Sequence, residues 1–239
     1  MTRRLSVPLG ALLAAALCSC GAKINGELRA GGAGELRIEA SFGKGIYGLA
    51  RSFAAFSGDS AGAAVLDAER INRSLRARPG VSSSSLVNSS PQTLAGTVTI
   101  SALAELLNAN QAAGVTFTEK NTGKAAPSGA LKVTLDRASA PQLLSLFAEE
   151  LSDYLAMLLA PIATGEALSR QEYLETLRSI YSGAVADEIA AARVTVSLRF
   201  PSAVKAVSGG AASGRSASFD IPLLDILVLD KPCVFEVEW

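Results

Sequence analysis

The sequence predicts an α+β fold in which one or two mainly antiparallel sheets have about four to five helices packed against them. Two patterns support this class. Apolar and polar residues alternate in several segments, as they do in strands that are buried on one side, and apolar residues recur every three or four positions in others, as they do in amphipathic helices. The composition agrees, because 49% apolar and 18% charged residues are typical of a globular chain.

The first elements expected are a hairpin and a helix. Residues 22–42 alternate in polarity on both sides of the run Gly31-Gly32-Ala33-Gly34, which suits a turn between two strands. A helix follows, because Ile46, Leu49, Phe53 and Phe56 are spaced so that they share one helical face.

The middle of the chain predicts a second helix and two pairs of strands. The helix spans residues 61–78 with Asp59 or Ser60 as its N-cap, and Pro79-Gly80 ends it. Alternation then predicts strands at 81–87, 94–100, 115–119 and 129–135, with a short helix at 102–112 between the second and the third.

The C-terminal part predicts two long helices and then further strands. The longest helix runs from Ser139 to near Pro161, and Ser169-Arg170-Gln171-Glu172 is a capping box that opens the next helix. That helix reaches Ala192 with a break at Gly183. Strands are expected at 194–200, on both sides of the loop 208–214 and at the end of the chain, with helical turns at 221–227. We expect one α+β domain over residues 20–239, and a sub-boundary near 80–92 is the alternative.

The first twenty residues have the layout of a secretory leader. Arg3 and Arg4 precede the apolar residues 5–17, which are too few to span a bilayer comfortably. They end in Leu17-Cys18-Ser19-Cys20, which resembles the lipobox of bacterial lipoproteins. The resemblance implies that residues 1–19 are a signal peptide and that Cys20 becomes the lipidated N-terminus. An ordinary secretory signal and an uncleaved membrane anchor are the alternatives.

The lipid on Cys20 predicts where the protein lies. Two or three acyl chains hold a protein on a membrane, because each buried methylene contributes about 0.8 kcal/mol. The resemblance therefore implies a lipid-anchored protein of the bacterial cell envelope, and Gly21 in place of an Asp favours the outer membrane of a Gram-negative type of envelope. Strand alternation begins directly after Cys20, so we expect the N-terminal hairpin to lie close to the membrane.

The composition argues against several functions. Basic and acidic residues both number 22, so there is no basic surplus to bind phosphates and we expect no nucleic-acid partner. The chain contains no histidine, which removes the commonest general base and the usual zinc ligand. We therefore expect no metal, no cofactor and no enzymatic activity. Once Cys18 is removed and Cys20 is acylated, Cys233 has no disulfide partner, and we expect it to be a small buried hydrophobic residue.

Two patterns could nevertheless suggest catalysis. Gly58-Asp59-Ser60-Ala61-Gly62 matches the serine-hydrolase pattern G-x-S-x-G, but the residues before it have helical spacing and no histidine can accept the serine proton. A dyad of Ser60 with Lys44 is the hydrolase arrangement that remains. The acidic pairs Glu149 with Asp153 and Asp187 with Glu188 are interpreted as exposed charge rather than as catalytic acids.

The apolar stripe of Ile46, Leu49, Phe53 and Phe56 is the candidate surface for a lipid or a protein partner. A stripe of this kind usually packs against the protein's own core, and that alternative stays open. We expect the protein to contact the membrane through the lipid on Cys20 and to bind a lipid ligand or an envelope protein there.

The layout of the chain after Cys20 resembles the LppM-type bacterial lipoproteins. Cys20-Gly21-Ala22 leads into a hairpin with the turn Gly32-Ala33-Gly34, and Phe200-Pro201 precedes a turn at Gly209-Gly210 and a last strand. The resemblance implies an α+β domain with a hydrophobic cavity for envelope lipids. We expect a non-enzymatic, lipid-anchored envelope protein that binds a lipid or an envelope partner at the membrane surface. The alternatives are a structural or assembly subunit of an envelope complex without a small ligand and, third, a histidine-free serine hydrolase.

Overall fold

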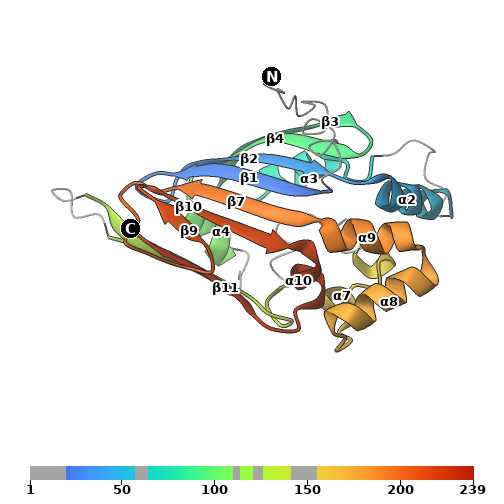
Figure 1. Ribbon diagram of the computed structural model, residues 1–239. Coiled ribbons are helices and arrows are strands. Elements are labelled where there is room, and N and C mark those ends of the chain that lie inside the picture. The colour runs from blue at the N-terminus through green and yellow to red at the C-terminus, as the bar shows by residue number, and fades with distance from the viewer. Residues whose placement is uncertain (1–19, 57–63, 110–113, 121–125, 141–154) are drawn as a thin grey trace, which may run out of the picture.

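The computed structural model describes residues 20–56, 64–109, 114–120, 126–140 and 155–239. Within these residues the chain forms eleven strands and seven helices, of which five have at least seven residues. The strands form a seven-stranded sheet, in the order β3-β4-β2-β1-β7-β10-β9, and a four-stranded sheet, in the order β5-β6-β11-β8 (Figure 1). The predicted α+β class is confirmed, but the number of helices is higher than four to five.

The predicted N-terminal hairpin forms the middle of the large sheet. Its two strands pair antiparallel with Gly21 opposite Ser41. A parallel pairing of the first strand with the segment that begins at Arg193 is the exception to the mainly antiparallel arrangement. The strands of this sheet are β1 (Gly21–Leu28), β2 (Gly34–Ser41), β3 (Val81–Ser90), β4 (Thr93–Ile100), β7 (Arg193–Arg199), β9 (Ala211–Ser213) and β10 (Ser216–Pro222).

Alternation along these strands gives the large sheet one apolar and one polar face. Ile24 lies between Ile38 and Val196 on the apolar face, and Lys23 lies between Glu39 and Thr195 on the polar face. Two layers pack against the apolar face, a helix over the β3–β4 side and the four-stranded sheet over the β7–β10 side. The charged residues of β1 and β2 on the polar face are mostly exposed to solvent.

The four-stranded sheet packs through aromatic residues. The rings of Phe200 and Trp239 stack with their centroids 4.8 Å apart, and both residues are almost completely buried. At one edge the strands on either side of Gly209 join the two sheets, because β8 pairs with β11 and β9 pairs with β10. The strands of the small sheet are β5 (Val115–Lys120), β6 (Ser128–Leu135), β8 (Ala206–Ser208) and β11 (Cys233–Glu238).

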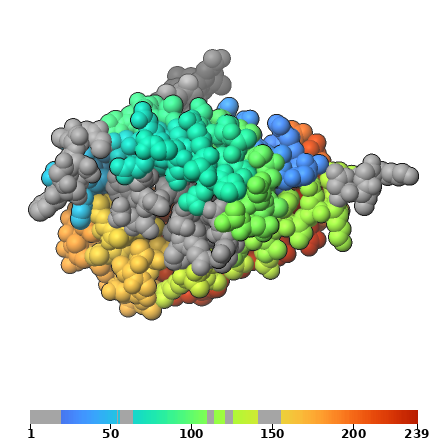
Figure 2. Space-filling model, turned by 180° about the vertical axis from the view of Figure 1, so that it is seen from behind, coloured from blue at the N-terminus to red at the C-terminus, as the bar shows by residue number. Residues whose placement is uncertain are grey.

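Helix α3 (Ala68–Arg76) covers the β3 edge of the large sheet. Its N-cap is Asp67, whose side chain accepts hydrogen bonds from the second and third residues of the helix. The prediction that this helix begins near residue 61 is wrong, because residues 64–67 are not helical, and Asp59 and Ser60 lie outside the described residues. Figure 2, seen from behind, shows α3 in teal on the surface of the molecule. The predicted helix 102–112 corresponds to α4 (Leu103–Ala109).

The remaining helices form a layer at one end of the large sheet (Figure 1). They gather there because α2 follows the end of β2, α9 leads into the start of β7, and α10 follows the end of β10. Buried residues from these helices, among them Ile46, Leu177 and Ile189, share one core. The helices of this layer are α2 (Lys44–Phe56), α7 (Pro161–Thr164), α8 (Arg170–Ile180), α9 (Gly183–Ala191) and α10 (Leu223–Val228).

Local signals for the two helices after residue 169 are confirmed. Ser169 and Glu172 form the predicted capping box of α8. The predicted break occurs at the start of α9, where Ser182 is the N-cap. Most of the predicted helix from Ser139 to Pro161 lies outside the described residues, and Pro161 begins a new short helix. In the described part of the chain no helix is both long and apolar enough to cross a bilayer.

Candidate functional site

Cys20, the predicted lipidation residue, lies directly before the central strand of the large sheet. Gly21, the next residue, pairs with Ser41 of β2 on one side and with Arg193 of β7 on the other. The Cys20 side chain is partly buried against the core of the helix layer. This burial raises the pKa of the thiol, and a hydrogen bond from the backbone N–H of Gly43 acts in the opposite direction. Sγ therefore lies at the junction between the sheet and α2.

Glu188 of α9 fixes this junction. Its carboxylate accepts a hydrogen bond from the N–H of Gly45 at 2.8 Å and another from the N–H of Ile46 at 2.9 Å. These amides belong to the first turn of α2 and have no partner within the helix, so a carboxylate there also interacts favourably with the helix dipole. Glycine at position 43 leaves room for this carboxylate, because a Cβ there would lie 2.3 Å from Cδ of Glu188 and would displace that side chain.

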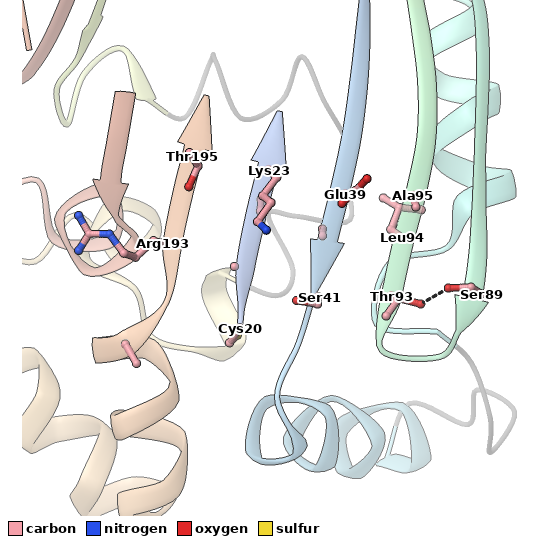
Figure 3. A pocket seen from close by; sticks show the side chains of 14 residues that line it. Cys20, Lys23, Glu39, Ser41, Ser89, Thr93, Leu94, Ala95, Arg193 and Thr195 are labelled. Carbon is pink, nitrogen blue, oxygen red and sulfur yellow. Dashed lines mark hydrogen bonds between the residues drawn. The ribbon is translucent and has the colours of Figure 1, made fainter. Parts of the chain in front are cut away.

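An open depression of about 520 Å³ adjoins Cys20 on the polar side of the sheet (Figure 3). Five neighbouring strands, β3, β4, β2, β1 and β7, contribute to it near the ends that face the helix layer. Its polar and charged lining residues are Cys20, Lys23, Glu39, Ser41, Ser89, Thr93, Arg193 and Thr195.

Charges of both signs surround the depression. Lys23 and Glu39 are opposite each other on β1 and β2, and both are exposed. In Figure 3 the Lys23 side chain points toward the end of the strand where Cys20 lies. Arg193 donates from Nε to Asp220 at 2.7 Å, and this contact raises the pKa of Arg193. Hydroxyl groups, an ammonium and a carboxylate suit a polar headgroup better than an acyl chain.

The predicted partner-facing stripe divides between core and surface. Ile46 is only 5% exposed and belongs to the core of the helix layer, and Leu49 packs against the same core. Phe53 is 44% exposed. The side chain of Phe56 lies outside the described residues. The part of the stripe that reaches solvent is therefore the end of α2 that is farther from Cys20.

Other residues considered for chemistry are not brought together. The G-x-S-x-G segment lies outside the described residues, and Lys44 is an exposed first residue of α2. Cys233 is partly buried, and burial together with nearby Asp225 raises the pKa of its thiol. The residues that the structure describes contain no group of histidine, cysteine and acidic side chains able to hold a metal ion.

Sequence reasoning missed Glu188, Lys23 and Arg193 as members of this region. Asp187 is exposed as predicted, with 72% of its side chain accessible, but Glu188 is partly buried and bound to α2. The signal that could have indicated its role is the pair Gly43 and Gly45 around the start of a helix, because two glycines there leave room for a side chain from another element.

The sequence matches no protein-family model and no curated protein. Among solved structures it is similar to the NMR structure of the folded domain of the Mycobacterium tuberculosis LppM protein. The two chains are 14% identical, the match covers 91% of this chain and 86% of the other, and the TM-score is 0.35.

Proposed function

We propose that this protein is a non-enzymatic, lipid-anchored protein of the bacterial envelope that binds a lipid or an envelope partner at the membrane surface. Acyl chains on Cys20 attach it to the membrane, and the outer membrane is the favoured location in a Gram-negative type of envelope. It needs no cofactor. The depression beside Cys20 holds the polar part of the ligand.

The observation that carries this proposal is the position of Cys20. The lipobox-like run ends at this residue, and β1 starts with the next one, so no flexible tether separates the anchor from the folded domain. Sγ lies at the base of α2, and the depression opens beside it. Acyl chains that start here keep the depression at the level of the lipid headgroups.

Metabolic labelling with radioactive palmitate tests the anchor. We expect label in the wild type and in Cys233→Ser, a matched control that removes a second partly buried cysteine. We expect Cys20→Ser to remain unlabelled and to keep residues 1–19, as measured by intact mass. Label in Cys20→Ser, or a mature chain that starts at another residue, would overturn the anchor.

Native mass spectrometry of the mature protein, released gently from its own membranes, tests ligand binding. A co-purified lipid that is lost in Lys23→Glu but kept in Lys205→Glu supports a headgroup site in the depression, because Lys23 lines it and Lys205 is an exposed lysine outside it. Recovery of the protein without any bound lipid would count against the lipid ligand and would leave an envelope protein as the partner.

A further inference from the structure

We propose that the outer end of the helix layer, formed by the end of α2 and the α8–α9 turn, inserts into the membrane interface as a second contact beside the acyl chains. The proposal rests on the proposed function, because the lipid on Cys20 is what brings this end to the bilayer. Phe53 and Ile180 are the inserted side chains.

The end of α2 and the α8–α9 turn lie side by side because α2 and α9 run antiparallel. Glu188, near the end of α9, binds the first turn of α2, so the start of α9 lies beside the later turns of α2. The α8–α9 turn and the end of α2 therefore lie on the same side of the layer, as Figure 1 shows. We call this side the outer end.

Apolar side chains are exposed at this end. Phe53 is 44% exposed and Ile180 is 52% exposed, and they are two of the five large hydrophobic residues that are exposed in the described part of the chain. Ser182 and Gly183, which follow in the turn, carry no charge. Moving this surface into the headgroup region costs little free energy of desolvation, because the residues around the aromatic and the aliphatic side chain are small and uncharged. Burial of the two apolar side chains there is favourable.

The charges around the outer end are compatible with this contact. Helix α2 contains Lys44 and Arg51 and no acidic residue. Arg51 lies over the ring of Tyr47, with Cζ 5.9 Å from the ring centroid, so an arginine and an aromatic side chain lie together one turn before the outer end. Arg178 and Asp187 pair with each other at 3.3 Å. Cationic and aromatic side chains at the level of the headgroups favour an interfacial position.

The distance between Cys20 and Phe53 determines what a membrane contact at the outer end adds to the acyl chains. Gly43 contacts Sγ of Cys20, and Phe53 lies ten residues further on, which corresponds to about 15 Å along a helix. One contact leaves the domain free to tilt about the anchor. Two contacts separated by this distance hold α2 along the bilayer surface and give the sheet a fixed orientation.

Tryptophan quenching in vesicles tests this inference on the acylated full-length mature protein. Phe53→Trp and Ile180→Trp place a reporter at the outer end, and Val234→Trp is the control at an exposed apolar position on β11. The vesicles contain phosphatidylcholine and phosphatidylglycerol, either unmodified or brominated near the headgroup end of the acyl chains. The native Trp239 is 1% exposed and supplies a constant background that is measured in the wild type.

We expect brominated lipid to reduce the added emission at positions 53 and 180 by about twofold or more and to leave position 234 within about a tenth of its unquenched value. Equal quenching at all three positions, or quenching at position 234 alone, would overturn the inference. Flotation of the same samples separates the two proposals. Protein that floats with the vesicles without quenching at 53 and 180 contradicts only the second contact, whereas protein that does not float contradicts the anchor.

Discussion

Replacing Glu188 by alanine should detach α2 from the rest of the helix layer. The substitution removes the acceptor of two hydrogen bonds, at 2.8 and 2.9 Å, from the first turn of α2. Hydrogen bonds to a charged group contribute about 1.5–3 kcal/mol each when they are buried. Both bonds are only partly buried, so water replaces part of each, and we expect the free energy of unfolding to fall by about 2 kcal/mol in total.

The neighbouring residue provides a matched control for this variant. Asp187 is on the same helix, but 72% of its side chain is exposed and its contact is an ion pair with Arg178. Asp187→Ala should therefore change the free energy of unfolding by no more than about 0.5 kcal/mol. Glu188→Gln keeps one oxygen acceptor but loses the charge, so we expect a loss of about 1 kcal/mol.

Two measurements on the detergent-solubilised protein check this prediction. Thermal unfolding should show a decrease of about 4–8 °C in Tm for Glu188→Ala, since a domain of this size shifts by about 2–4 °C per kcal/mol. Hydrogen exchange should speed up in the first two turns of α2 while the strands of the large sheet keep their protection. Equal Tm values for Glu188→Ala and Asp187→Ala, or unchanged exchange in α2, would refute the role assigned to Glu188.

Three further substitutions test contacts in other parts of the fold. Asn72→Ala should lower the free energy of unfolding, measured by urea denaturation, by about 2–3 kcal/mol. The reason is that the side chain of Asn72 accepts a hydrogen bond from the N–H of Leu86 and donates one to its C=O on the edge strand. A loss below about 0.5 kcal/mol would contradict this role. Gly129→Ala should destabilise the protein by about 2 kcal/mol and shift the Trp239 emission to longer wavelength. The new Cβ would lie 2.5 Å from the indole ring and would displace it. An unchanged emission spectrum would contradict this displacement. The hydrogen bonds that Glu172 accepts from Ser169 lower its pKa from 4.5, so their stabilisation is present above pH 4.5 and disappears as the pH falls through the lowered value. The Tm difference between the wild type and Glu172→Gln should accordingly vanish in acid, and a difference independent of pH would contradict the capping role.

The elements that could be predicted from the sequence depend on neighbouring residues. The hairpin of β1 and β2 follows from an alternation of period two around a glycine-rich turn. The capping box at Ser169 and the break before α9 are also signals contained within a few positions. Each of these signals describes a local backbone preference that the rest of the fold leaves unchanged.

The features that could not be predicted join distant residues. The parallel pairing of β1 with β7 brings Gly21 beside Arg193, and neither strand's composition specifies that partner. Glu188 could not be distinguished from an exposed acid, because its partners are backbone amides, which leave no trace in the sequence. Helix α3 starts at Asp67 rather than near residue 61 because apolar spacing locates a helical face better than a helix end.

The candidate site likewise combines a feature that neighbouring residues specify with features that depend on distant residues. Cys20 is a candidate on local signals alone, because the lipobox-like run precedes it directly, and its lipidation stays a prediction. The difference between buried Ile46 and exposed Phe53 depends on how far α9 extends along α2, which the periodicity of α2 alone does not contain. The depression beside Cys20 requires the register of five strands that come from three separate parts of the chain.

The central position of β1 also determines how the domain resists mechanical force. Under the proposed lipidation of Cys20, a pull on the anchor, from lateral drag or from a bound partner, would enter the fold at Cys20 and act along β1. That strand is paired along its length with β2 on one side and with β7 on the other. Force along the strand loads both ladders in shear, so many hydrogen bonds must break together, whereas a pull on an edge strand would open them one at a time. Because forced unfolding depends on the unfolding barrier, attachment at a doubly paired strand suits a domain that is pulled by its N-terminus.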